Sequence, residues 1–158
     1  MTWLPDQTLA DFATVARLAG VSLATDDIRI EALPAPHEPP KRLPAGKMAV
    51  YVFTYGDDVL KVGKAGPKSQ ARYTSQHYNP GSARSTLAAS IIADAERIGL
   101  SEADRANPAK IRNWIQTHVD RVNILLPAEL GVPVLTLLES FLQCCLRPRY
   151  EGFRSQRG

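Results

Sequence analysis

The sequence of 158 residues has no long uninterrupted apolar run. Residues 119–130 and 132–146 form its longest apolar stretches, and polar or charged residues such as Asp120 and Glu139 interrupt both. Neither stretch reaches the length of about 20 apolar residues that a membrane-spanning helix needs. The first residues also lack the basic start and apolar core of a secretory signal. We therefore expect a cytoplasmic protein without a membrane partner.

Cysteine is scarce too, and acidic residues are outnumbered by basic ones. Cys144 and Cys145 are adjacent in an apolar helical stretch, where neighbouring side chains point apart, so we expect two reduced core residues without a disulfide. The 19 Lys and Arg residues exceed the 16 Asp and Glu residues, which gives a net charge of +3. This excess favours a polyanionic partner only weakly, because many enzymes without such a partner carry a similar charge.

Five prolines between Pro34 and Pro44 divide the chain. Proline fixes φ and donates no backbone hydrogen bond, so we interpret residues 34–46 as a semi-rigid linker. Before the linker, apolar residues at helical spacing predict a helix over Thr8–Ala19. We therefore expect an N-terminal helical extension over residues 1–33 and a main domain over residues 47–154.

The main domain begins with two short β-prone runs. Residues 48–54 and 58–63, which Gly56-Asp57 joins, predict a β-hairpin. The stretches that follow predict three helices, one strand and a long apolar helix, over residues 67–76, 85–98, 108–117, 119–126 and 132–146. This order predicts an α+β fold, in which helices flank a small three-stranded antiparallel sheet and the third strand lies beside the hairpin.

Five residues that can carry chemistry follow one another along this domain. They are Tyr51 in the first hairpin strand, Lys61 before Val62-Gly63 in the second, Arg72 and His77 on and after the first helix, and Glu139 on the last helix. This order resembles the GIY-YIG nuclease family, in which two strand motifs precede a helical arginine, often a histidine, and a distant helical glutamate. The resemblance spans residues 48–152, and it leaves the N-terminal segment uncovered.

Glu139 is the most informative single residue. It interrupts the apolar residues 134–142, where an unpaired buried charge is costly, so we expect it to have a partner. By the resemblance it is the protein ligand of a hard cation, Mg²⁺ or Mn²⁺, which binds few protein oxygens and keeps several waters. The alternatives are an exposed helix residue or a structural ion pair.

Tyr51 and Arg72 fit the other needs of phosphodiester hydrolysis. The reaction requires a nucleophilic water, neutralisation of the phosphoryl oxygens and assistance to the leaving oxygen. The resemblance implies that Tyr51 positions or deprotonates the water, while Arg72 offers a planar donor fork to the phosphate. Taken alone, Tyr51 would more often be a packing residue and Arg72 a solvated surface residue.

Lys61 and His77 leave more than one interpretation open. Lys61 stands where the family pattern has its second tyrosine, and it could bind a phosphate, hold a nearby tyrosine in its ionised form, or be an edge-strand charge. His77 comes five positions after Arg72, so the two share a face only if the helix ends before the histidine. Two further departures from the pattern are Ala49 in place of a glycine and Glu151 where the family often has asparagine.

Residues 14–22 carry a second, shorter resemblance, to the helix-turn-helix of lac-repressor-type regulators, with Gly20 in the turn. The acidic residues Asp26 and Asp27 follow, although a helix that reads a DNA groove should not be acidic. We therefore favour a helix that packs on the main domain over a regulator that reads operator DNA.

Together these features predict a metal-dependent endonuclease that hydrolyses DNA phosphodiester bonds. The expected partner is DNA, the expected cofactor is Mg²⁺ or Mn²⁺, and one site per chain would favour a homodimer for cutting both strands. The alternative is a non-catalytic nucleic-acid-binding module on the same scaffold. The altered strand motifs favour this alternative, whereas the presence of Glu139 opposes it.

Overall fold

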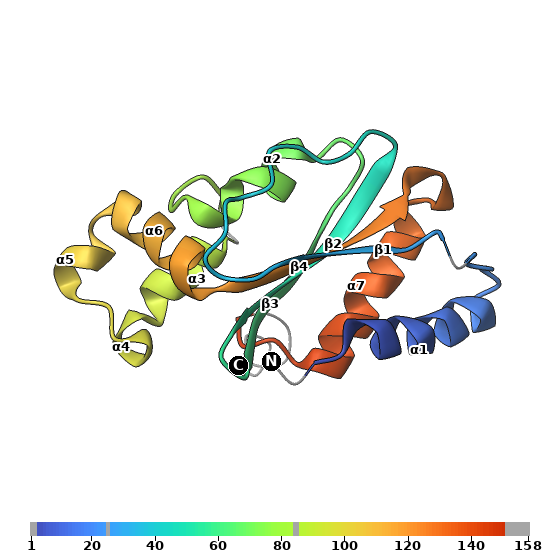
Figure 1. Cartoon of the computed structure of the whole chain (residues 1–158), viewed down its shortest axis with the longest axis horizontal. Coiled ribbons are helices and arrows are strands. Elements are labelled where there is room, and N and C mark those ends of the chain that lie inside the picture. Colours follow the sequence, from blue (N-terminus) through green and yellow to red (C-terminus); the bar gives the residue numbers. More distant parts are fainter. Residues whose placement is uncertain (1–2, 25, 84–85, 151–158) are drawn as a thin grey trace.

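A four-stranded antiparallel sheet forms the centre of the computed structural model, which describes residues 3–24, 26–83 and 86–150 (Figure 1). The strand order across the sheet is β1-β4-β2-β3, so β2 and β4 are central. The strands are β1 (Arg29–Leu33), β2 (Lys47–Tyr55), β3 (Asp58–Ala65) and β4 (Asp120–Pro127).

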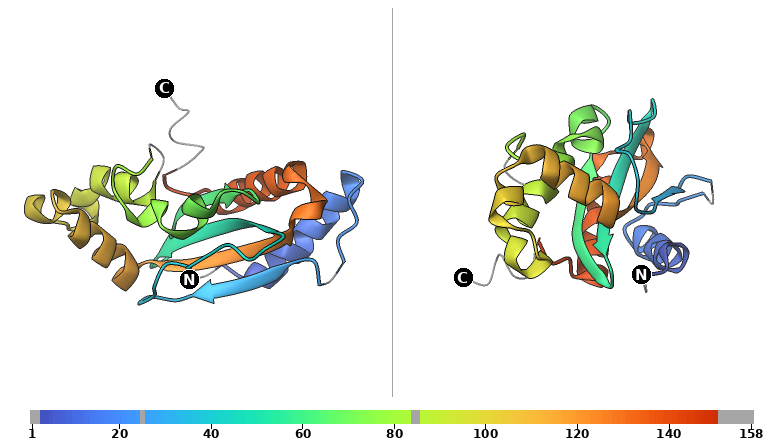
Figure 2. Two further views of the ribbon diagram at one scale, coloured as in Figure 1. Left: turned by 90° about the horizontal axis from the view of Figure 1, so that it is seen from above. Right: turned by 60° about the vertical axis from the view of Figure 1, so that its left-hand side comes forward.

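Helices cover both faces of this sheet (Figure 1 and Figure 2). On the side that we call the α7 face lie α1 (Pro5–Leu18) and α7 (Val132–Leu146). The opposite side, called the α2 face, is covered by α2 (Gln70–Thr74), the single turn η1 (Gln76–Tyr78), α3 (Leu87–Ala93) and α6 (Pro108–His118). The short elements α4 (Ala95–Ile98), α5 (Glu102–Arg105) and η2 (Ala128–Leu130) complete the described chain.

The central strand β2 is buried on both faces because helices cover each side of it. Successive side chains of a strand point to opposite faces, so alternate residues enter two different cores. Met48, Val50 and Val52 join the cluster under α1 and α7. Tyr51 and Phe53 join the cluster under α2, α3 and α6.

The expected hairpin is confirmed by the pairing of β2 with β3. Tyr55 pairs with Asp58 across the two-residue turn Gly56-Asp57. Gly56 has a φ of 58°, which the first central position of such a turn requires and which glycine adopts without strain. β4 pairs with the other side of β2, so the prediction of a strand beside the hairpin is also confirmed.

A β-bulge in β3 decides where Lys61 points. Thr54 pairs with Val59, but the next residue of β2, Phe53, pairs with Lys61, so Leu60 is an extra residue in β3. A bulge of this kind re-aims the side chains that follow it. Lys61 therefore lies opposite Phe53 on the α2 face, and only 1% of it is exposed.

The α+β class is confirmed, but the prediction of three strands was wrong. The fourth strand, β1, comes from the segment that was expected to be a helical extension, and it pairs with the outer side of β4. β1 has only five residues and no clear apolar alternation, so its conformation depends on a partner distant in sequence. The prediction of three strands missed it for that reason.

The N-terminal helix packs on the domain. Phe12 of α1 lies against Phe141 of α7, with 5.6 Å between the ring centroids. The described residues between α1 and β1 form turns and extended chain rather than a second helix, so the helix-turn-helix is absent from that part. No helix of the described chain combines the length and apolar character that crossing a membrane requires.

The prediction that both cysteines lie in the core was wrong, because Cys144 and Cys145 are exposed. The buried stripe of α7 consists of Val134, Leu135, Leu138 and Leu142. Cys144 falls outside this stripe. Cys145 lies in the last turn of the helix, where it lines a surface pocket.

Candidate functional site

Tyr51 occupies a fixed position at the centre of the α2 face. It pairs with Gly63 of β3 on one side and with Asn123 of β4 on the other. A Cβ atom on Gly63 would lie 2.7 Å from the Tyr51 hydroxyl and ring, so the tyrosine ring lies directly over this glycine. The Val62-Gly63 motif therefore provides the space that holds the Tyr51 ring against the sheet.

His77 binds the Tyr51 hydroxyl. α2 ends at Thr74 and His77 lies in η1. The helix therefore ends before the histidine, as a shared face with Arg72 requires. The Nε2 atom of His77 lies 2.6 Å from the Tyr51 Oη, while its Nδ1 accepts a hydrogen bond of 3.2 Å from the Leu87 amide. A backbone amide can only donate, so Nδ1 carries no proton and Nε2–H donates to Tyr51.

Positive charges surround this pair of side chains. The pKa of His77 is lowered from 6.5 to about 2, because the ring is buried and because Lys61, Arg72 and Arg121 add positive charge. His77 is therefore neutral across the physiological range and remains a donor to Tyr51. The guanidinium carbon of Arg121 also lies 5.4 Å from the centroid of the Tyr51 ring, so positive charge is close to both side chains.

Tyr51 and Arg72 meet at one backbone atom, the carbonyl oxygen of Lys64. Arg72 donates from Nε to this oxygen at 3.2 Å, and the Tyr51 hydroxyl lies 3.5 Å from it. Lys64 follows Gly63 near the end of the edge strand β3, where the chain turns towards α2. The strand end and α2 thus bring the predicted tyrosine and arginine together.

Glu139 joins the cluster through the Lys64 side chain. Side chains alternate along β3, so Lys64 points to the α7 face, where its ammonium group forms an ion pair with the Glu139 carboxylate. The side chain of Glu139 is 15% exposed and that of Lys64 is 35% exposed. The prediction that Glu139 has a partner is confirmed, and that partner is a lysine.

The five predicted residues differ in exposure. Tyr51, Lys61 and His77 are almost completely buried, at 0%, 1% and 1%. Arg72 and Glu139 are partly exposed. The accessible part of the cluster is therefore the rim that Arg72, Lys64 and Glu139 form, and the Tyr51–His77 pair lies beneath it.

Arg121 is a fully buried cation that sequence reasoning did not select. Its guanidinium donates to Asn123 at 2.7 Å, to the Tyr73 carbonyl at 2.6 Å and to the Tyr78 hydroxyl at 3.3 Å. The guanidinium carbon also lies 5.1 Å to 5.9 Å from the ring centroids of Tyr51, Phe53, Tyr73 and Tyr78. Within the described chain no carboxylate pairs with it. The sequence did contain a signal for this polar site: Arg121 and Asn123 are alternate residues of one strand, so their side chains point to the same face.

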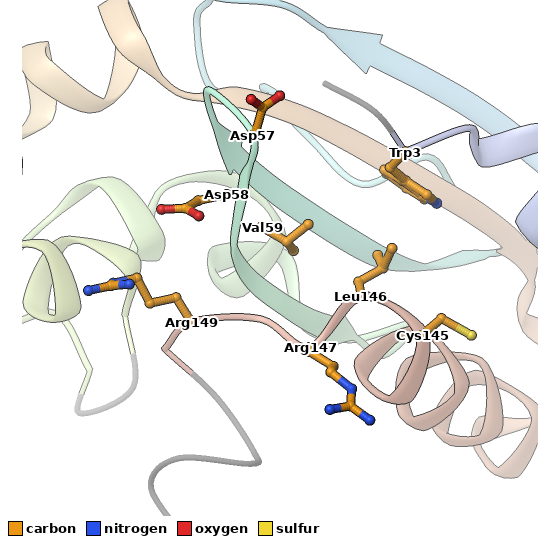
Figure 3. Close-up of a pocket in the computed structure, with 8 residues that line it drawn as sticks. All are labelled: Trp3, Asp57, Asp58, Val59, Cys145, Leu146, Arg147 and Arg149. Carbon is orange, nitrogen blue, oxygen red and sulfur yellow. The ribbon is translucent and has the colours of Figure 1, made fainter.

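A surface pocket lies elsewhere, between the β2–β3 turn and the end of α7 (Figure 3). Acidic side chains line one side and basic ones the other: Asp57, Asp58, Arg147 and Arg149. Arg149 donates to Asp94 at 3.0 Å, so its charge already has a partner. None of the residues that line this pocket belongs to the Tyr51 cluster.

The metal-ligating side chains near the candidate site suit only a hydrated cation that takes few ligands from the protein. In the described ranges, no three His, Cys, Asp or Glu side chains are grouped closely enough to hold a metal ion. A lone carboxylate such as Glu139 fits a hydrated Mg²⁺ or Mn²⁺, which keeps several waters and takes further oxygens from a substrate phosphate. It does not fit an ion that needs an all-protein cage.

Glu151, one of the departures from the family pattern, lies outside the residues that the structure describes. Comparisons of the chain with models of protein families, with curated proteins and with solved structures give no match.

Proposed function

We propose that the protein is a metal-dependent endonuclease that hydrolyses DNA phosphodiester bonds, like the GIY-YIG nucleases that its sequence resembles. One observation carries the proposal. Tyr51 and Arg72 share the backbone carbonyl of Lys64, and the side chain of the same lysine binds Glu139. Residues from two strands and two helices thus form one connected cluster.

Tyr51 prepares the attacking water in this proposal. Its oxygen accepts a hydrogen bond from His77 Nε2–H, and positive charges lie around both groups. A donated hydrogen bond and nearby cations stabilise negative charge on an oxygen. In its ionised form, the Tyr51 phenolate can therefore orient the water and accept one proton from it as the new P–O bond forms, which leaves a neutral phenol.

Arg72 neutralises the phosphate under attack. Its Nε is occupied by the Lys64 carbonyl, so the two terminal nitrogens of the guanidinium remain for phosphate oxygens. Lys61 is almost completely buried, and it contributes positive charge from beneath rather than a direct contact at the surface. Charge of this kind stabilises the transition state as negative charge gathers on the phosphoryl oxygens.

Glu139 is the residue that would hold Mg²⁺ or Mn²⁺. The cation, when bound, supplies Lewis-acid stabilisation of the phosphate and of the oxygen that leaves as the P–O bond of the DNA breaks. Glu139 contributes one carboxylate from α7, at the rim that Arg72 and Lys64 also form. The basic side chains of this rim suit the polyanionic backbone of DNA.

The test is cleavage of supercoiled plasmid and of single-stranded DNA by the purified protein in Mg²⁺ or Mn²⁺. We expect cleavage by the natural sequence, and a loss of at least about 10²-fold in rate for Glu139→Gln, which keeps the shape but not the charge. Glu129→Gln, on the single turn η2, is a matched control that should leave the rate unchanged. Intact DNA in every metal would refute the proposal.

The burial of Tyr51 favours a second candidate, a non-catalytic module that binds nucleic acid. The Tyr51 hydroxyl has no exposed surface, and protein groups already lie against it. Such a module would bind DNA in a manner that weakens steeply with salt, because it contacts the phosphates, and it would leave the DNA intact. Salt-dependent binding without cleavage would select this function over the nuclease.

A further inference from the structure

Glu139 and Lys64 satisfy each other's charge at the rim of the candidate site. Among the described residues, Lys64 is the one cation that forms an ion pair with Glu139. Arg72 is engaged at the Lys64 carbonyl, and Gln143, one turn after Glu139 on α7, donates to the Val62 carbonyl. The ammonium group of Lys64 therefore occupies the position beside the carboxylate that a metal ion would also seek.

We propose that Lys64 is the resting counter-ion of Glu139, that a divalent cation displaces it, and that the released ammonium group then binds a DNA phosphate. This inference rests on the proposed function, because it concerns the same carboxylate. It adds that metal binding and DNA binding are coupled, and that one lysine side chain carries the coupling.

The exchange is physically reasonable because neither state leaves Glu139 without a cation. A carboxylate that is only 15% exposed is costly to leave unpaired. The Lys64 ammonium group can pair with this carboxylate until a divalent ion binds. The lysine stem is flexible and the side chain is 35% exposed, so the ammonium group can move into water or to a phosphate at small cost.

The exchange also explains why Lys64 and Arg72 can act differently on a phosphate. Arg72 is anchored by its bond from Nε to the Lys64 carbonyl, so its position does not depend on Glu139. The position of the Lys64 ammonium group does depend on it. The rim therefore contains one fixed cationic group and one that metal binding sets free.

The first test measures Mn²⁺ binding to the full-length protein without DNA, by electron paramagnetic resonance of free Mn²⁺. Lys64→Met keeps the length of the side chain and removes its charge, so Mn²⁺ no longer has to displace a competitor. We expect Lys64→Met to bind Mn²⁺ roughly threefold to tenfold more tightly than the natural protein, the effect of losing one partly exposed ion pair.

Lys68→Met is the matched control, because it removes the same charge from an exposed lysine nearby. It should tighten Mn²⁺ binding much less than Lys64→Met. Lys64→Arg retains a competing cation and should bind Mn²⁺ no more tightly than the natural protein. Equal or weaker Mn²⁺ binding by Lys64→Met, or equal gains in the two methionine variants, would overturn the inference. If Lys64→Met does not fold, Lys64→Gln takes its place.

The second test measures the coupling by fluorescence anisotropy of a labelled DNA duplex, in EDTA and in Ca²⁺, with gels to confirm that the duplex stays intact. Thermodynamic linkage requires that metal tightens DNA binding if it frees a phosphate ligand. Ca²⁺ should strengthen binding by roughly threefold to tenfold in the natural protein and much less in Lys64→Met. The same Ca²⁺ effect in both proteins would contradict the proposed exchange.

The two proposals fail in different ways. Cleavage of DNA together with unchanged Mn²⁺ affinity in Lys64→Met would refute the exchange and leave the nuclease intact. If Lys64→Met binds Mn²⁺ more tightly but the natural protein cleaves no DNA, the nuclease is refuted. The exchange is then retained in a metal-regulated binding module.

Discussion

The two faces of the sheet differ in chemistry although both are buried. Apart from Lys64 at the edge of the sheet, the α7 face is lined by apolar side chains: Met48, Val50, Val52, Val62, Val122, Ile124 and Leu126. The α2 face is lined by the same strands, yet it contains Tyr51, Lys61, Arg121 and Asn123. Because alternate residues of one strand point to opposite faces, β2 and β4 each contribute to both.

Away from the edge of β3, where Lys64 meets Glu139, this difference separates the residues that stabilise the fold from those proposed to act in catalysis. Burial of an aliphatic side chain stabilises a fold by about 1.5–3 kcal/mol, whereas a buried cation without a carboxylate partner costs free energy. Arg121 lies on the α2 face, where aromatic rings and a backbone carbonyl replace the lost water. The apolar α7 face offsets this cost, so substitutions on the two faces should have different consequences.

The largest expected effect is on catalysis, from Tyr51→Phe. This change removes the hydroxyl that would prepare the water, so we expect the cleavage rate of plasmid DNA to fall by about 10²-fold or more. The free energy of unfolding in urea should fall by only about 1–3 kcal/mol, because His77 loses one acceptor. Phe53→Leu changes the next residue of β2 that points to the α2 face, and this variant should retain most of the cleavage activity.

A substitution in the apolar part of the α7 face should lower the stability of the fold without changing the cleavage rate. Ile124→Ala on β4 leaves a cavity under α1 and α7, and we expect it to lower the free energy of unfolding by about 2–5 kcal/mol. The cleavage rate per folded molecule should stay close to that of the natural protein. If Ile124→Ala reduced this rate as strongly as Tyr51→Phe, the separation between the two faces would not hold.

A smaller effect should come from Gly63→Ala. The new Cβ would lie 2.7 Å from the Tyr51 ring, which is packed against His77 and Arg121 and has little space to move. We expect a loss of about 1–3 kcal/mol in the free energy of unfolding, together with slower cleavage. Gly66→Ala is the matched control, because the nearest atom to its Cβ is 3.8 Å away.

The two effects of Gly63→Ala can be tested for a common cause. If the Cβ acts by pushing the Tyr51 ring, the same substitution should cost much less free energy in a Tyr51→Leu background, as a double-mutant cycle would measure. Equal costs in both backgrounds would contradict the close contact.

The smallest effect is a pH dependence that originates on the α2 face. Burial, Lys61, Arg72 and Arg121 lower the pKa of His77 from 6.5 to about 2 in the folded chain, so only the unfolded chain binds its proton at pH 3–6. The stability from neutral His77 is present above pH 6.5 and is lost as the pH falls, with a slope approaching about 1.4 kcal/mol per pH unit.

Urea titrations between pH 7.5 and 4.5 test this expectation. His77→Gln should flatten the fall in unfolding free energy relative to the natural protein. His118→Gln, at an exposed position on α6, should leave the slope unchanged. An identical slope in the natural protein and in His77→Gln would contradict the burial of a neutral imidazole.

Local sequence signals predicted the parts of the fold that local physics determines. The Gly56-Asp57 turn and the alternation around it were sufficient to predict the hairpin. Glu139 among apolar residues was sufficient to predict a partner for its charge. In both cases the sequence signal lay within a few residues of the feature that it predicted.

The remaining features depend on contacts between distant segments. β1 is a strand because β4 pairs with it, and the same pairing makes β4 a central strand. Without β1, Arg121 would be expected on an exposed edge strand. Likewise, the location of Lys61 depends on a bulge at Leu60, which the sequence of β3 does not signal.

The meeting of Tyr51 and Arg72 at the Lys64 carbonyl has a consequence for mutagenesis. A peptide oxygen is supplied by whichever amino acid stands at position 64, so scanning side chains cannot delete this acceptor. Variants of Lys64 should therefore change the ammonium group while the tyrosine and arginine stay anchored. Only a change to the peptide unit itself, such as an ester introduced by chemical synthesis, would disturb that anchor.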